Sequence, residues 1–156
     1  MGRREKVLFL YRQRSDLAPL AWSWVDRQLT DAGTYWVVGQ LDGRPHPRPV
    51  WGVWQQERLH LSIGSPTVRR AIEQQPAVTV HLDSGTDVVI VEGLVAPAAA
   101  TAPSVLEAYN RKYDYDYQVG QFGELTTVLP GKVLAWRAAG WAGRDSFQQT
   151  GSWTFD

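Results

Sequence analysis

The chain has 156 residues, of which 44% are hydrophobic and 21% are charged, and this is typical of one globular domain rather than of a disordered or fibrous chain. Sixteen basic residues match sixteen acidic ones, which leaves no net charge to attract nucleic acid or a membrane surface. With no cysteine, no signal peptide and no membrane-spanning run, we expect a soluble cytoplasmic protein without disulfides or zinc–thiolate sites.

A helix is the first expected element, after an N-terminal extension over residues 1–14. Apolar residues recur at helical spacing over residues 16–32. Ser15 or Asp16 is placed as the N-cap of this helix, and Gly33 as its C-terminal stop.

A β-hairpin is expected next. Residues 35–41 are aromatic and β-branched, and residues 49–54 resume an extended pattern. Asp42 and Gly43 between them are a strong turn signal. Because prolines cannot donate to a strand ladder, we expect the second strand to pair fully only after Pro49.

Strands alternate with a short helix in the middle of the chain. Residues 58–63 alternate apolar and polar side chains, which predicts a strand with one buried face. A proline suits the first turn of a short helix over residues 66–74. Two further runs, residues 77–83 and 88–95, predict a second hairpin.

The last third of the chain combines a linker, a helix and strands. Residues 96–103 are rich in Ala and Pro, and Ser104 with Glu107 forms a capping-box signature for a helix over residues 104–113. The remainder is expected to form loops over residues 114–124 and 138–149 and strands over residues 125–129, 132–137 and 150–155. Five to seven strands with helices between the hairpins predict one β-rich α+β domain over residues 1–156, built as a closed or half-closed β-barrel.

The segment from Gly39 to Trp54 carries the first candidate site. It places Arg48 beside strand backbone and aromatic surface. This combination suits a planar anionic ligand, because a guanidinium bonds carbonyl or phosphate oxygens in a fixed fork geometry. Judged on spacing alone, a solvent-exposed strand arginine beside an edge proline is the more frequent interpretation.

The strand-to-helix junction over residues 61–70 is the second candidate site. A strand ends at Gly64 and Ser65 where a helix begins, so free helix N–H groups lie close to Arg69 and Arg70. Such a junction can bind a phosphate, although the Lys-Ser/Thr signature of a P-loop is absent. Taken alone, the segment also fits a capped helix with two solvated arginines.

Together these segments resemble the flavin- and deazaflavin-binding split β-barrels related to pyridoxamine 5'-phosphate oxidase. Residues 34–54 resemble the first hairpin of that family, residues 58–82 its phosphate-binding strand-helix-strand unit, and residues 87–95 the following strand. Weaker likeness extends to residues 112–117, KYDYDY, and to residues 130–136, PGKVLAW. The resemblance implies a split β-barrel that forms a homodimer, with two cofactors, FMN or the deazaflavin F420, in clefts shared by both subunits.

The resemblance also implies which residues hold the cofactor. Residues 48–50 would flank the ring system, Ser62 and Ile63 would continue that wall, and the turn over residues 65–70 would face the phosphate. The complete set of implied cofactor-binding residues is Arg48, Pro49, Val50, Trp51, Ser62, Ile63, Gly64, Ser65, Arg69, Arg70 and Trp153.

Two departures from the family pattern concern the phosphate. The basic pair of the family falls on Thr67 and Val68, so that valine replaces the usual lysine, and Arg69 and Arg70 are the candidates to take over its role. Near the C-terminus, residues 152–155 read Ser-Trp-Thr-Phe where many relatives carry Arg-Trp-Arg-Phe.

Two functions are therefore considered. The first is an FMN- or F420-dependent oxidoreductase that transfers hydride to or from a small organic substrate. The second is a non-enzymatic, ligand-binding split barrel whose phosphate site has eroded. No catalytic acid or nucleophile is nominated, because the cofactor supplies the redox chemistry in this family. His46, His60 and His81 lack ligand-spaced partners, and no metal site is expected.

Overall fold

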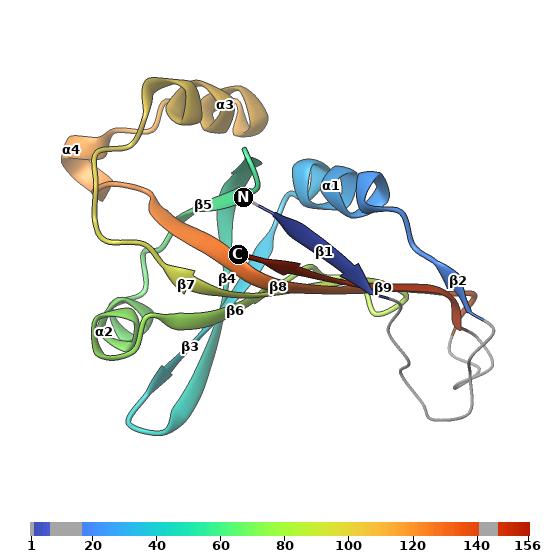
Figure 1. Ribbon diagram of the computed structural model, residues 1–156. Coiled ribbons are helices and arrows are strands. Elements are labelled where there is room, and N and C mark those ends of the chain that lie inside the picture. Colours follow the sequence, from blue (N-terminus) through green and yellow to red (C-terminus); the bar gives the residue numbers. More distant parts are fainter. Residues whose placement is uncertain (1, 7–16, 141–146) are drawn as a thin grey trace.

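The computed structural model describes residues 2–6, 17–140 and 147–156, and in them nine strands form one continuous sheet (Figure 1). The strands are β1 (Arg3–Lys6), β2 (Ala18–Pro19), β3 (Tyr35–Leu41), β4 (Arg44–Gln55), β5 (Arg58–Ser62), β6 (Ala77–His81), β7 (Asp87–Val95), β8 (Thr126–Ala138) and β9 (Phe147–Phe155). The helices are α1 (Trp22–Asp31), α2 (Pro66–Gln74), α3 (Pro103–Tyr113) and α4 (Val119–Phe122). None of the helices within the described residues is long and apolar enough to cross a membrane.

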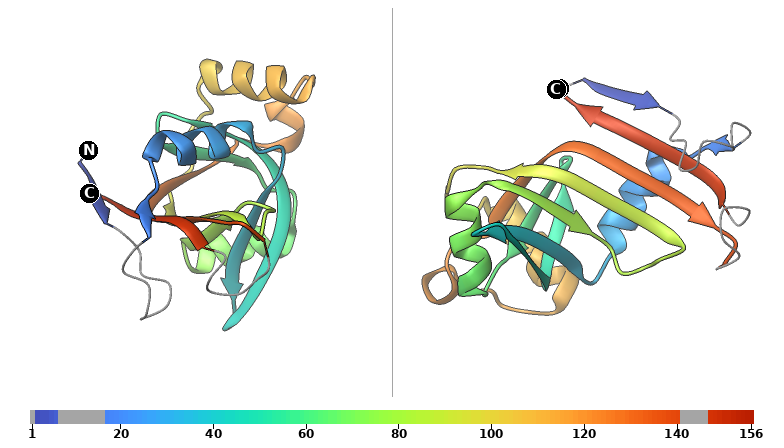
Figure 2. Two further views of the ribbon diagram at one scale, coloured as in Figure 1. Left: turned by 90° about the vertical axis from the view of Figure 1, so that its right-hand side faces the viewer. Right: turned by 90° about the horizontal axis from the view of Figure 1, so that it is seen from below.

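The sheet closes into a barrel. Its ring runs β8-β5-β4-β3-β6-β7, and β7 pairs back onto β8 (Figure 2). Neighbouring strands of the ring are antiparallel, as expected for a chain built from hairpins. This arrangement confirms the predicted β-rich α+β barrel.

The two ends of the described chain lie side by side. Strand β9 pairs with β8 outside the ring, and β1 pairs antiparallel with β9, with Arg3 opposite Phe155 (Figure 1). The sequence did not predict β1, because its four residues are all exposed and show no apolar alternation.

Helix α1 begins at Trp22 rather than at residue 16. Pro19, in β2, has no N–H and disfavours helical geometry in the residue before it. The chain therefore stays extended as far as Ala21, which is the N-cap residue. The predicted N-caps, Ser15 and Asp16, lie outside the described residues.

The predicted capping box of α3 is wrong. This helix begins at Pro103, and its N-cap residue Ala102 makes no side-chain cap hydrogen bond. Proline is favoured at the first helical position because its missing N–H would be unpaired there in any case. Ser104 and Glu107 consequently lie inside the helix.

Strand β4 pairs with β3 from its first residue, contrary to the prediction that prolines delay the ladder. Pro45 and Pro47 lie opposite Gln40 and Val38. In an antiparallel pair only alternate residues donate to a given neighbour, and the prolines occupy the positions whose N–H would point away from β3. Strand β5 pairs with β4 only from Trp51 onwards, so the missing donors lie on an unpaired edge.

The two strands predicted over residues 125–129 and 132–137 are one strand, β8. It continues through Pro130, which lies opposite Gly93 of β7 beside a shift in the strand register. A Cβ on Gly93 would lie 2.6 Å from the carbonyl oxygen of Leu129, and only glycine allows this approach.

Two predicted loops contain regular structure. Helix α4 lies within the predicted loop over residues 114–124. Strand β9 begins at Phe147, inside the loop predicted over residues 138–149, of which residues 141–146 lie outside the described residues.

The core accounts for four of the eight tryptophans, Trp22, Trp24, Trp54 and Trp153. Trp22 of α1 packs edge-on against Trp54, Trp153 and Phe155, with ring centroids 5.2 to 6.3 Å apart. A second apolar cluster lies between α3 and the barrel and consists of Val53, Val105, Tyr109, Tyr117 and Leu125. Of the tryptophans within the described residues, Trp51 alone is among the exposed large hydrophobic side chains.

Candidate functional site

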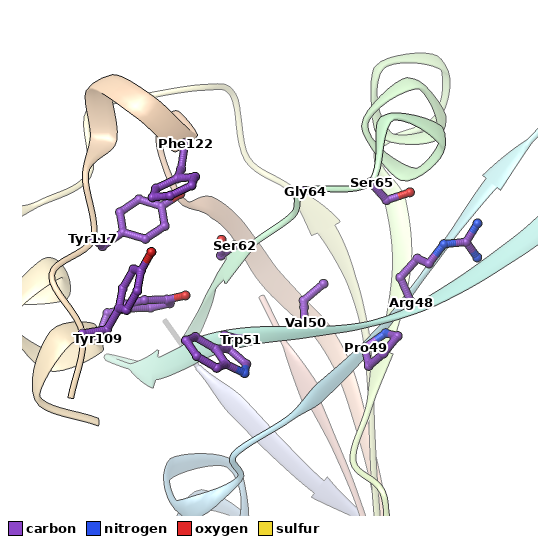
Figure 3. Close-up of a pocket in the computed structure, with 11 residues that line it drawn as sticks. Arg48, Pro49, Val50, Trp51, Ser62, Gly64, Ser65, Tyr109, Tyr117 and Phe122 are labelled. Carbon is purple, nitrogen blue, oxygen red and sulfur yellow. The ribbon is translucent and has the colours of Figure 1, made fainter. Parts of the chain in front are cut away.

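A cavity of about 500 Å³ opens between β4, the junction of β5 with α2, and the segment from α3 to α4. Its lining residues are Arg48, Pro49, Val50, Trp51, Ser62, Gly64, Ser65, Tyr109, Tyr115, Tyr117 and Phe122. Figure 3 shows aromatic side chains at one end of this cavity, Arg48 and Ser65 at the other, and Val50 between them.

The structure brings together seven of the residues that the sequence singled out, namely Arg48, Pro49, Val50, Trp51, Ser62, Gly64 and Ser65. The other four do not line the cavity. Ile63 is buried in the core, Trp153 of β9 has no exposed surface, and Arg70 is exposed on α2. Arg69 is held by two backbone carbonyl groups.

Arg48 is the one charged residue among the described residues that line this cavity. It is half-buried, and its Nη1 donates to the carbonyl oxygen of Pro47 at 2.8 Å. Figure 3 shows its guanidinium pointing away from the aromatic end. The positive charge of the cavity is therefore concentrated at the end next to Ser65.

The N-terminus of α2 lies at the same end. Ser65 is the N-cap, its Oγ accepts a hydrogen bond from the backbone N–H of Val68 at 3.4 Å, and Pro66 occupies the first turn. The positive end of the helix dipole favours an anion here.

Arg69 of α2 makes two hydrogen bonds to the backbone of other elements. Its Nε donates to the carbonyl oxygen of Ile63 at 2.6 Å, and its Nη2 donates to that of Phe122 at 3.2 Å. These bonds join the end of β5 to α4. A guanidinium that satisfies two structural carbonyl groups has fewer donors left for a phosphate.

Val68, at the position where the family carries its lysine, has no exposed surface. It faces β3, where a Cβ added to Gly39 would lie 3.7 Å from Val68 Cγ1 and 3.1 Å from Ala71 Cβ. This close approach of α2 to β3 turns residue 68 toward the core. Thr67, the other residue of the pair, keeps part of its surface exposed.

The sequence did not single out four aromatic residues at the other end of the cavity. Together with Trp51, these residues form what we call the aromatic wall: Trp51, Tyr109, Tyr115, Tyr117 and Phe122. The available signal was the KYDYDY run, whose tyrosines alternate with aspartates. Alternation usually indicates a strand, whereas here the run begins in the last turn of α3 and leaves the helix at Asp114, which is in the left-handed conformation (φ 47°).

Tyr113 joins α3 to the barrel through both its ring and its hydroxyl group. Its ring stacks on Trp51 with centroids 4.5 Å apart and planes at 4°. Its Oη lies 2.9 Å from the N–H and from the carbonyl oxygen of Gly52, and 3.0 Å from that of Gly33. Since β3 begins only at Tyr35, this hydroxyl takes the place of a β3 partner for Gly52, which pairs with Leu61 of β5 on its other side.

Lys112, the residue before Tyr113, also bonds to Gly52. Its Nζ donates to the Tyr35 hydroxyl at 2.9 Å and to the Gly52 carbonyl oxygen at 3.0 Å. Burial lowers the pKa of Lys112 to about 8, and the charge of Asp31 opposes this shift. Burial also raises the pKa of Tyr35, whose hydroxyl donates to the Leu29 carbonyl oxygen at 2.5 Å.

The depressed pKa of Lys112 predicts a pH-dependent stability. Between about pH 8 and 9, below the ordinary tyrosine pKa of 10.0, the unfolded chain binds more protons at Lys112 than the folded one, so this residue makes the free energy of unfolding rise with pH. We expect this rise in wild type and its loss in Lys112→Met, measured by urea unfolding at pH 7, 8 and 9. Lys132→Met, outside the network, should keep it. The same pH profile in wild type and Lys112→Met would contradict the assignment.

The hydroxyl group of Tyr109, in the aromatic wall, is uncharged at neutral pH. Burial raises the pKa of Tyr109 to about 12, although a hydrogen bond with Ser62 acts in the opposite direction. The hydroxyl of Tyr117 donates to the Gly123 carbonyl oxygen at 3.0 Å. The cavity thus combines a cationic end with an aromatic, uncharged end.

No protein-family model and no curated protein matches the chain. Among solved structures, an FAD-binding protein from Mesorhizobium loti is 14% identical, with a TM-score of 0.57, over 99% of this chain and 100% of that one. A putative pyridoxamine 5'-phosphate oxidase from Listeria innocua is 15% identical (TM-score 0.53), over 73% and 93%. A protein described as F420 reductase is 19% identical (TM-score 0.54), over 69% and 94%. The expected resemblance is confirmed as one of fold: the chain has the split β-barrel of pyridoxamine 5'-phosphate oxidase-like proteins.

Proposed function

We propose that this protein is a cytoplasmic oxidoreductase that holds FMN or F420 and transfers hydride to or from a small organic substrate. The observation that carries the proposal is the division of one cavity into a cationic end and an aromatic end. Such a division suits a ligand with a planar ring and an anionic tail. Similar folds bearing the descriptions FAD-binding protein and F420 reductase support the choice of cofactor.

The ring of the cofactor would lie against β4 and β5. Pro49 and Val50 supply an extended backbone beside the cavity, and Ser62 of β5 lies opposite Trp51, the next residue on β4. The carbonyl group of Pro49, on the edge that β5 leaves unpaired, can accept a hydrogen bond from the polar edge of a ring. When bound, the cofactor supplies hydride chemistry, while the chain binds it, orients it and keeps water from its ring.

The anionic tail would lie at the N-terminus of α2. Helix N–H groups and the charge of Arg48 supply the attraction there. Gly64 leaves room for a group to approach, because no atom lies within 4 Å of a Cβ built on it. The residues present therefore fit a phosphate, although with fewer cationic groups than a lysine and two free arginines would provide.

A second candidate function has a specific observation in its favour. Arg69 is bonded to two carbonyl groups, and Val68 is buried where the family has lysine. A split barrel with so few free cationic groups also fits a non-enzymatic module whose phosphate site has eroded. The two functions differ in whether FMN or F420 binds.

The test is the affinity of wild type and two variants for FMN and F420. We expect Arg48→Ala to weaken binding at least tenfold, equivalent to about 1.4 kcal/mol, through loss of a charge-assisted bond. Arg44→Ala is the matched control, on the same strand but outside the cavity. The absorption spectrum of freshly purified protein tells FMN from F420. If wild type binds neither at millimolar concentration, the oxidoreductase proposal fails and the eroded module remains.

We further propose that the chain forms a homodimer, with the partner subunit covering the open side of the cavity. Trp22, Trp24, Trp54 and Trp153 pack in or against the core, whereas Trp51, Tyr115 and Phe122 are exposed at the cavity, where a partner can exclude water. Light scattering at micromolar concentration should give twice the chain mass of 17.5 kDa. A measured mass equal to that of one chain would rule out a cavity shared by two subunits.

A further inference from the structure

A second cavity, of about 480 Å³, opens between α2, the linker over residues 96–102 that follows β7, and the start of β8. Figure 1 and Figure 2 show α2, this linker and α4 at the same end of the barrel. The second cavity shares no lining residue with the one described above. It is therefore a separate hollow, and its volume is in the range of small-molecule sites.

Part of the second cavity is apolar. Ile72 of α2 and Val95 at the end of β7 pack against the main core cluster, and Leu125 belongs to the cluster beneath α3. All three line the cavity. The linker adds three alanines and one proline over residues 96–99. An apolar side chain of a ligand would be removed from water here.

Arg69 lines the second cavity and not the first. Within the described residues, two of its five N–H donors are bonded, one to the carbonyl oxygen of Ile63 and one to that of Phe122. Both partners are uncharged, and no carboxylate of the described residues forms an ion pair with Arg69. The positive charge and three donors remain available to an anionic group.

Two exposed carboxylates line the same cavity, and in the described part of the chain neither belongs to an ion pair. Glu73 follows Arg69 by one turn of α2, the spacing at which helical side chains are neighbours. Glu124 is held by Thr101, whose N–H donates to Glu124 Oε2 at 2.7 Å. Hydrogen bonds from the side chain and the backbone of Thr101 lower the pKa of Glu124, which keeps this carboxylate ionised at neutral pH.

Opposite charges that line one cavity without pairing favour a ligand that carries both signs. A simple anion would be attracted by Arg69 but repelled by the two carboxylates, and a simple cation would be repelled by the guanidinium. A zwitterion gains attraction at both of its ends. The separation of one helical turn between Arg69 and Glu73 suits an α-amino acid, whose carboxylate and ammonium groups are attached to the same carbon.

We propose that the second cavity binds a free α-amino acid with an apolar side chain. The carboxylate of the amino acid binds Arg69, and its ammonium group binds Glu73 and Glu124. Its side chain contacts the apolar part of the cavity. This assignment does not depend on the proposed function, because it uses no residue that lines the first cavity.

The test compares L-leucine with leucinol and 4-methylpentanoate by isothermal titration calorimetry on the purified protein at pH 7. Leucinol lacks the carboxylate of leucine, and 4-methylpentanoate lacks its ammonium group. We expect leucine to bind about fivefold or more tightly than either analogue, because each analogue loses a charge-assisted interaction at a partly exposed site. No leucine binding at millimolar concentration, or equal affinity for leucine and either analogue, would overturn the proposal.

Two variants locate the site. Glu73→Gln, which removes a charge from an exposed side chain and keeps its shape, should weaken leucine binding about threefold or more. It should not weaken binding of 4-methylpentanoate, which has no ammonium group to lose a partner. Glu107→Gln, also exposed but on α3 outside the cavity, is the matched control and should bind leucine as wild type does. Unchanged leucine affinity in Glu73→Gln would show that leucine binds elsewhere.

Discussion

Val68→Lys should lower the free energy of unfolding by about 3–5 kcal/mol, the usual cost of an unpaired charge in a protein interior. The side chain of residue 68 has no exposed surface and faces β3 at Gly39. Restoring the lysine of the family at this position would therefore place an ammonium group in the core rather than at a phosphate. Urea unfolding at pH 7 measures the loss directly.

Thr67→Lys is the matched control, because it adds the same charge one residue earlier on a partly exposed position of α2. We expect it to cost less than about 1 kcal/mol, mainly through the unfavourable helix dipole. It should also strengthen FMN binding if the phosphate lies at this helix end. Equal stability of the two lysine variants would show that residue 68 does not face the core as described.

Trp153→Ala should cost about 3–5 kcal/mol, as large-to-small substitutions of buried aromatic residues do. Trp153 is fully buried, its ring lies 5.2 Å from that of Trp22, and a Cβ on Gly151 would overlap it. The alanine leaves a large cavity between α1 and the sheet. Thermal and urea unfolding would both report this loss.

Trp153→Phe provides the comparison. Within the described residues, the indole N–H of Trp153 has no hydrogen-bond partner, so its removal relieves an unsatisfied donor while an aromatic ring remains. We expect a much smaller loss of stability than in Trp153→Ala. A loss as large as that of the alanine would show that the N–H is bonded and that the tryptophan is required for more than its volume.

The position of Trp153 in the structure differs from the one that the family resemblance implied. Its position in the C-terminal Ser-Trp-Thr-Phe run implied a contact with the cofactor, yet its side chain is buried in the core of its own chain, against Trp22 of α1. The pairing of β9 with β8 and β1 decides this orientation. A one-residue change of register would turn the same tryptophan outward.

The local elements were determined largely by the sequence. Asp42 and Gly43 form the predicted turn, both with positive φ (51° and 75°), because few other pairs tolerate that backbone. Ser65 and Pro66 start α2 where predicted, since an N-cap oxygen followed by proline matches the first helical turn. Local signals thus placed the turn before β4 and the start of α2, which flank the cationic end of the cavity, whereas the residues that line it were implied by the family resemblance.

Tertiary structure alone decided the rest. Helical spacing over residues 16–32 did not reveal that Ala18 and Pro19 pair with β9, more than a hundred residues away in the chain. The burial of Val68 depends on where α2 meets β3, and the aromatic wall depends on α3 being fastened to β4 at Gly52. These contacts join residues far apart in sequence, and local periodicity carries no information about which distant surface an amphipathic element will meet.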